Sequence, residues 1–266
     1  DKLVTGVQTC ALPIFMWVAV EASTLATAPL IYFNRTPRSI EATWKYLLVG
    51  SVGIALALLG SFFLAYASLG ENSSLLFSDL LARAPYMSRP WLQVAFVLLV
   101  VGYGTKMGLA PMHTWKPDAY GEAPGVVGAL LAGGLTNCAF LALLRVFHIC
   151  RIAHEGAYAG RLLVFFGIFS IAVAAVFMVG QRDFKRMLAY SSVEHMGILV
   201  LGVGLGGSGV FAALLHMLNN GLTKGVLFLS AANIHRAYDS KSIDEVRGAL
   251  RRVPLSGALF LAGFFA

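Results

Sequence analysis

The chain has 266 residues, of which 58% are hydrophobic and 12% charged, and its mean hydropathy is +0.75. Soluble domains average about 25% charged residues, so this composition excludes a soluble globular protein and indicates a lipid-embedded one. The formal charge of +7 comes from basic residues in short segments between apolar runs, a pattern of membrane topology rather than of nucleic-acid binding.

Apolar runs follow one another along the whole chain, and no alternating pattern typical of β-strands competes with them. A membrane-spanning helix needs about 20 such residues, so we predict an all-α, polytopic transmembrane helix bundle of about eight spans, the last one incomplete. An amphipathic stretch at residues 75–81 is expected to lie in the membrane interface. The runs are 15–33, 46–68, 91–110, 126–144, 162–180, 188–205, 211–234 and 253–266.

The two ends of the chain have unusual sequences. Residues 4–14 read VTGVQTCALPI, which resembles the translation of a common sequencing adapter, so residues 1–14 are excluded from the fold prediction. The remaining residues, 15–266, are expected to form a partial transmembrane domain. Because both Phe15 and Ala266 lie inside apolar runs, we expect the parent protein to be longer at both ends.

Lysine and arginine are distributed unevenly between the loops. The loops after the first, third, fifth and seventh runs hold most of them, among them Lys45, Lys116 and Lys185. The positive-inside rule therefore predicts that these loops lie in the cytoplasm.

Ionisable residues inside the runs need an explanation, because a charge at the bilayer centre costs about 2.5–3.5 kcal/mol. Glu21 lies about two turns into the first run, and Lys106 lies close to Gly108 and Pro111. Proline removes a backbone donor, so we predict one broken helix near Pro111, followed by His113. Broken helices at membrane depth mark transport sites. The alternatives are a helix-end carboxylate for Glu21 and a snorkelling side chain for Lys106.

The seventh run carries His216, Asn220 and Lys224 at intervals of four residues, so they share one stripe of a helix. A structural hydrogen-bonded seam would explain this stripe, but titratable histidine and lysine favour a proton path. Near the start of the sixth run, four polar residues either line the inner mouth of such a path or form an ordinary polar helix start: Ser191, Ser192, Glu194 and His195.

Three segments resemble the signatures of antiporter-like, proton-translocating membrane subunits of the complex I and membrane-bound hydrogenase superfamily. They are GTKMGLAPMHTWKPDA (104–119) followed by EAP (122–124), DFKRMLAYSSVEHMG (183–197) and LHMLNNGLTKG (215–225). SVEHMG (192–197) together with KSIDEVRG (241–248) is most similar to hydrogenase-4 component F.

The resemblance implies a membrane subunit of a redox-driven proton pump, of the hydrogenase-4, formate hydrogenlyase or NADH-quinone oxidoreductase type. Its expected partners are other membrane subunits and a peripheral redox arm, and its expected location is the plasma (inner) membrane of a prokaryote. The alternatives are a subunit of a multisubunit Na⁺/H⁺ antiporter and a non-pumping membrane scaffold for a hydrogenase. No spacing in the sequence matches a flavin, quinone, iron–sulfur, metal or nucleic-acid site, so the chain is not expected to be the redox catalyst or to bind a cofactor.

The resemblance also implies roles for individual residues. Lys106 would be the switched proton site, Glu21 its ion-pair partner, and His216 and Lys224 a lateral relay. Two positions differ from the family: Asn137 stands where lysine or histidine is common, and Asn220 where a second histidine is common. Because asparagine carries no charge, a relay through either position needs bridging water. The supporting residues would be His113, Asn137, Glu194, His195 and Asn220.

Overall fold

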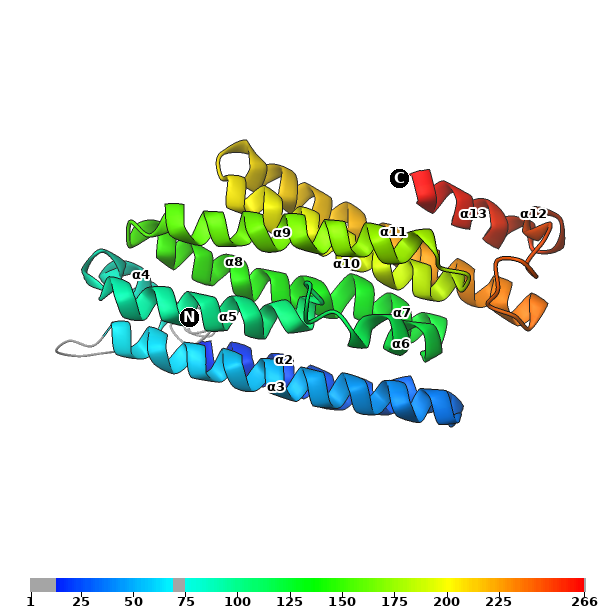
Figure 1. Ribbon diagram of the computed structural model, residues 1–266, viewed down its shortest axis with the longest axis horizontal. Helices are drawn as coiled ribbons and strands as arrows, with labels where there is room; N and C mark the ends of the chain where they lie inside the picture. The colour runs from blue at the N-terminus through cyan, green and yellow to red at the C-terminus, as the bar shows by residue number, and fades with distance from the viewer. Residues whose placement is uncertain (1–12, 69–74, 266) are drawn as a thin grey trace, which may run out of the picture.

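The computed structural model describes residues 13–68 and 75–265, so most of the adapter-like segment lies outside the described residues. Within these ranges every regular element is helical, apart from one bridge between Asp183 and Ser242. The long helices lie side by side along one axis (Figure 1). The elements are α2 (Pro13–Ile31), α3 (Pro37–Ala67), α4 (Phe77–Arg83), α5 (Arg89–Met107), α6 (Trp115–Glu122), α7 (Gly125–Leu130), α8 (Thr136–Ile152), α9 (Gly156–Val179), α10 (Phe184–Leu205), α11 (Ser208–Tyr238), α12 (Ala249–Arg252) and α13 (Pro254–Phe265), with 3₁₀ turns at Tyr32–Asn34 and Ala84–Tyr86 and a π-helical segment at Leu131–Leu135.

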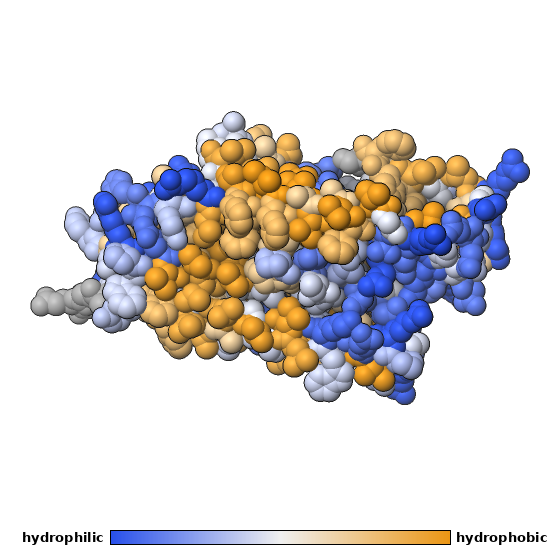
Figure 2. Space-filling model, in the orientation of Figure 1, coloured by the Kyte–Doolittle hydropathy of each residue, from blue (hydrophilic) through white to orange (hydrophobic). Residues whose placement is uncertain are grey.

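The predicted all-α, multi-pass membrane fold is confirmed, with a smaller number of clear spans. Among the described residues six helical segments are long and apolar enough to cross a membrane. Each of the eight predicted runs is helical, but α11 is made more polar by its stripe and α13 has only 12 residues. Hydrophobic side chains cover the middle of the molecule and hydrophilic ones gather at its two ends (Figure 2). The six segments are Pro13–Asn34, Pro37–Ala67, Arg89–Met107, Gly125–Ile152, Gly156–Val179 and Phe184–Leu205.

Glycines set how closely neighbouring helices approach. A Cβ atom on Gly167 of α9 would lie 2.8 Å from the carbonyl oxygen of Gly197 on α10. A Cβ atom on Gly160 would meet the carbonyl oxygen of Gly204 at the same distance. Small residues of this kind allow two backbones to pack directly in a membrane. Helices α9 and α10 therefore pack with their backbones close together.

The predicted break in the third span is confirmed. Helix α5 ends at Met107, because Gly108 has a φ of +76° and takes the left-handed conformation that glycine adopts without a steric penalty. The chain is irregular until α6 begins at Trp115. The backbone N–H of Ala110 donates to Ser170 Oγ at 3.0 Å, so the irregular segment is tied to α9. Residues 108–110 and His113 of this segment are buried and Pro111 and Thr114 are exposed, so protein covers part of the non-helical backbone.

Candidate functional site

Lys106 lies at the end of α5, fully buried, and reaches towards α2. Its Nζ donates to Thr24 Oγ1 at 2.5 Å and lies 3.7 Å from Glu21 Oε2. The ammonium is also 5.4 Å from the ring centroid of Tyr46 on α3, within the range of a cation–π contact. Gly50 leaves the space for it, since a Cβ atom there would lie 2.7 Å from Nζ. The structure thus brings Glu21 and Lys106 together beside the helix break; their role in proton transfer stays a prediction.

Lys116 is not the cytoplasmic loop charge that the sequence analysis predicted. The side chain is fully buried, because α6 continues beyond the break in the direction of α5 and packs against α3 and α10 (Figure 1). Its Nζ donates to Ser192 Oγ on α10 at 3.0 Å and lies 5.7 Å from the ring centroid of Tyr120. A Cβ atom on Gly108 would collide with the aliphatic part of the Lys116 side chain. The glycine that ends α5 therefore also makes room for this lysine.

The polar stripe of α11 faces a matching set of residues on α10. Lys224, which is buried, donates to Ser191 Oγ at 2.7 Å. Two turns from Lys224 along α11, His216 Nε2 lies 3.0 Å from His195 Nδ1 of α10, which is hydrogen-bonding distance. The tautomers of the two rings decide which nitrogen donates. Glu194 is half-buried on the same helix. The stripe therefore lies against α10 at both of its ends.

The two asparagines singled out by the sequence analysis lie on neighbouring parts of α8 and α11, Asn137 on the first and Asn220 on the second. Asn137 Nδ2 donates to the carbonyl oxygen of Gly133 in the π-helical segment at 2.8 Å. A Cβ atom on Gly221 of α11 would lie 3.1 Å from the same Nδ2 atom. Asn137 Oδ1 and both polar atoms of the buried Asn220 have no hydrogen-bond partner among the described residues. His113 Nδ1, in the broken segment, also has no hydrogen-bond partner among the described residues. These groups retain hydrogen-bonding capacity in the middle of the bundle.

A charged cavity opens at the end of the bundle that is predicted to be cytoplasmic, and we call it the charged basin. Asp118 Oδ2 is 2.8 Å from Lys45 Nζ, and Asp118 Oδ1 is 2.5 Å from Arg186 Nη2. Asp118 therefore joins α3, α6 and α10 only two residues beyond the buried Lys116. The basin has a volume of about 450 Å³ and is lined by Arg38, Glu41, Ala42, Lys45, Pro117, Asp118, Glu122, Asp183 and Arg186.

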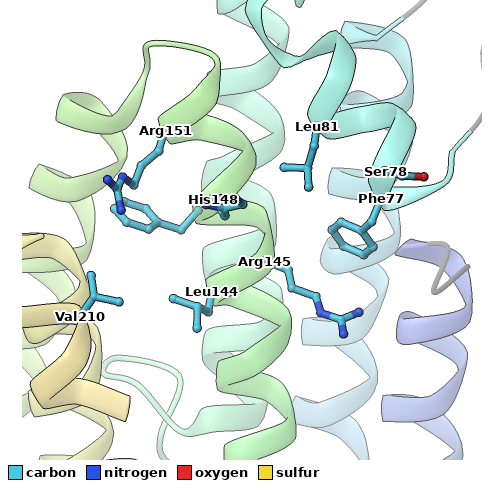
Figure 3. Close-up of a pocket in the computed structure, with 9 residues that line it drawn as sticks. Phe77, Ser78, Leu81, Leu144, Arg145, His148, Arg151 and Val210 are labelled. Carbon is cyan, nitrogen blue, oxygen red and sulfur yellow. The ribbon is translucent and has the colours of Figure 1, made fainter. Parts of the chain in front are cut away.

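An apolar cavity at the opposite end is separate from this site (Figure 3). Arg145 of α8 lies over the Phe77 ring of α4, 5.4 Å from its centroid. None of the predicted proton-site residues lines the cavity, so we assign it no part in the site. Its volume is about 550 Å³, and its walls are Phe77, Ser78, Leu81, Leu144, Arg145, Phe147, His148, Arg151 and Val210.

Sequence reasoning missed Lys116 and Asp118 as parts of the site. Lys116 and Asp118 lie in the segment that carries the first family signature, which is the signal that could have identified them. Ser191 was expected at the mouth of the path, and the structure places it against Lys224.

Curated relatives align with nearly the whole chain. The hydrogenase-4 component F homolog of Methylacidiphilum infernorum is 38% identical over 256 residues, which cover 94% of this chain and 54% of the relative. The NADH-quinone oxidoreductase subunit N of Desulforudis audaxviator is 35% identical over 250 residues, which cover 93% and 49%. The chain thus spans about half the length of these relatives.

Solved structures show the same fold. A chain of the membrane-bound sulfane sulfur reductase, an archaeal respiratory membrane complex, superimposes with a TM-score of 0.87 at 25% identity, covering 94% of this chain and 51% of the other. A chain of respiratory complex I from Thermus thermophilus gives a TM-score of 0.76 at 29% identity, covering 96% and 54%. A family model described as "NADH:quinone oxidoreductase/Mrp antiporter, TM" matches residues 13–266. The chain therefore belongs to this family of transmembrane subunits.

Proposed function

We propose that this chain conducts protons as a membrane subunit of a redox-driven complex of the hydrogenase-4 or NADH-quinone oxidoreductase type. The observation that carries the proposal is the fully buried Lys106 ammonium, which meets Glu21 beside a helix break. Its partners would be other membrane subunits and a peripheral redox arm, and it would reside in the plasma membrane of a prokaryote. Relatives named as subunits of hydrogenase-4 and of NADH-quinone oxidoreductase support this assignment.

The physical basis is that the surroundings of Lys106 support two protonation states. A buried ammonium is tolerated only with a counter-charge and hydrogen bonds, and Glu21 and Thr24 supply these at 3.7 Å and 2.5 Å. The neutral amine avoids the desolvation cost, so the apolar surroundings accept it as well. A change in the Glu21–Lys106 distance would therefore load or release one proton.

The polar contacts between α10 and α11 supply the onward route. The Lys224–Ser191 hydrogen bond and the His195–His216 contact lie one helical turn apart on α10. All four side chains carry an exchangeable proton, and serine and histidine both donate and accept hydrogen bonds. They would carry a proton laterally within the bundle.

The test is Lys106→Met in the complex that contains this chain, reconstituted into vesicles, with proton uptake and electron transfer measured together. We expect assembly and electron transfer to persist and proton translocation to be lost. Lys185→Met is the matched control, because Lys185 is also buried but donates to the backbone carbonyl of Ala123 at 2.7 Å. Normal acidification by the Lys106 variant would refute the proposal.

The family description also includes Mrp antiporters, so the same vesicles test a second candidate function. Sodium-dependent proton exchange without any redox substrate would identify an antiporter subunit. Electron transfer by the unmodified complex with no ion movement at all would identify a scaffold that anchors the redox arm.

A further inference from the structure

We propose that Lys116 is a further proton-transfer site, which connects the region of Lys106 with Lys224 through the neighbouring hydroxyl groups of Ser191 and Ser192. The inference rests on the proposed function and extends it to a residue outside the predicted proton site. One proton would pass from the Lys106 ammonium to the neutral Lys116 amine and then to the neutral Lys224 amine. Each donor becomes neutral as its acceptor gains the charge, so the net charge of the chain is unchanged.

The first support is the burial of Lys116 without a counter-charge. Its side chain is completely inaccessible, and it forms no ion pair within the part of the chain that the structure describes. An uncompensated buried charge is destabilising, and an apolar side chain of similar size would be a better structural choice at such a position. A lysine that can give up its proton explains why this position holds an amine.

The second support is the shared anchor on α10. Lys116 donates to Ser192 Oγ at 3.0 Å, and Lys224 donates to Ser191 Oγ at 2.7 Å. Ser191 and Ser192 are consecutive, so the two amines approach α10 at the same level from two sides. A hydroxyl group donates and accepts at once, which makes it a suitable bridge for a proton. Two like charges at one level oppose each other's protonation, which favours one shared proton over two.

The third support is the space made for Lys116 in the broken segment. Gly108 lies two residues after Lys106, and any side chain at Gly108 would overlap the stem of Lys116. The Lys116 amine lies against the ring of Tyr120, and the Lys106 amine lies against the ring of Tyr46, at 5.7 Å and 5.4 Å from the centroids. The break thus holds both amines in similar aromatic surroundings, one on each side of it.

The fourth support is the composition of the direct route through α8. On that route Asn137, whose Nδ2 lies beside Gly221 of α11, cannot carry charge. Lys116 supplies an amine on α6 instead. It also lies two residues from Asp118 of the charged basin, so protons from the aqueous end have a short route to it.

The experiment compares Lys116→Met, which keeps the approximate volume but cannot titrate, with Lys116→His, which can. Each is measured in the assembled complex in vesicles, as protons translocated per electron transferred, with Lys185→Met as the control for losing a buried lysine. We expect Lys116→Met to lower proton transfer by about 100-fold, the lower end of what a positioned proton-transfer group contributes. Lys116→His should restore a substantial part of it, and Lys185→Met should keep the wild-type ratio.

Assembly yield and electron-transfer rate separate the outcomes. Wild-type proton transfer in Lys116→Met would overturn the inference. Equal losses in Lys116→Met and Lys116→His, in fully assembled complexes, would also overturn it, because they would show a purely structural role. Persistent translocation in Lys106→Met would instead refute the proposed function, so the two failures are distinguishable.

Discussion

Replacing Glu21 with glutamine tests the ion pair at the centre of the site with little change in shape. The carboxylate lies 3.7 Å from Lys106 Nζ, and the exposed fraction of its side chain is 19%. At this separation, two unit charges attract with about 1 kcal/mol in bulk water and about 4.5 kcal/mol at an effective dielectric constant of about 20. The mostly buried environment favours a value nearer the second figure. Even about 2 kcal/mol would change the occupancy of the charged state about 30-fold.

We therefore expect Glu21→Gln to lower proton translocation by about tenfold or more, while electron transfer continues. The assay is the quenching of a pH-sensitive dye in vesicles, recorded together with substrate oxidation. Glu21→Asp is the matched control, because it keeps the charge on a shorter stem and should retain more activity than the amide. Wild-type pumping by Glu21→Gln at normal assembly would show that Lys106 does not depend on this carboxylate, which would refute the reasoning.

Three further changes test the surroundings of the site. Gly50→Ala places a methyl group only 2.7 Å from Lys106 Nζ. The amine must then shift, so proton translocation should fall severalfold in an assembled complex. Gly167→Val would force the valine side chain against the carbonyl oxygen of Gly197, 2.8 Å from a Cβ atom, and an overpacking penalty of about 1–3 kcal/mol should lower assembly yield and melting temperature. His216→Phe removes the 3.0 Å contact to its histidine partner on α10 and should slow proton translocation without changing melting temperature. Wild-type translocation by Gly50→Ala or His216→Phe, or wild-type assembly and melting temperature of Gly167→Val, would contradict these expectations.

The membrane fold and the helix break could be predicted because both follow from local chemistry. The length of an apolar run determines whether a helix can span, and Gly108 and Pro111 act on the backbone within one turn. Helix starts were less predictable. Helix α3 begins at Pro37, nine residues before the predicted run, because Thr36 accepts a hydrogen bond from Ser39 N at 3.1 Å and caps a polar first segment. Hydropathy marks the lipid-facing part of a helix and not its end.

The site was only partly predictable, for a different reason. The pairing of Glu21 with Lys106 was expected from the family resemblance, and the stripe on α11 from its spacing. The burial of Lys116 depends on α6 packing against α3 and α10 after the break, which is a tertiary contact with no local signal in the sequence. In the sequence, a lysine flanked by polar residues cannot be distinguished from a loop charge that sets the membrane topology.

The arrangement of α10 and α11 explains how a proton could pass Asn220. A route along α11 alone meets this buried asparagine between His216 and Lys224, and asparagine cannot carry charge. Helix α10 offers a parallel route, because Ser191 and His195 are one turn apart and each contacts one of those two residues, at 2.7 Å and 3.0 Å. Both polar atoms of Asn220 are unpaired among the described side chains, so it retains capacity to orient water between the two rows. The titratable groups then lie on alternating helices, and the neutral amide at the centre keeps the two ionisable ends of the α11 stripe apart.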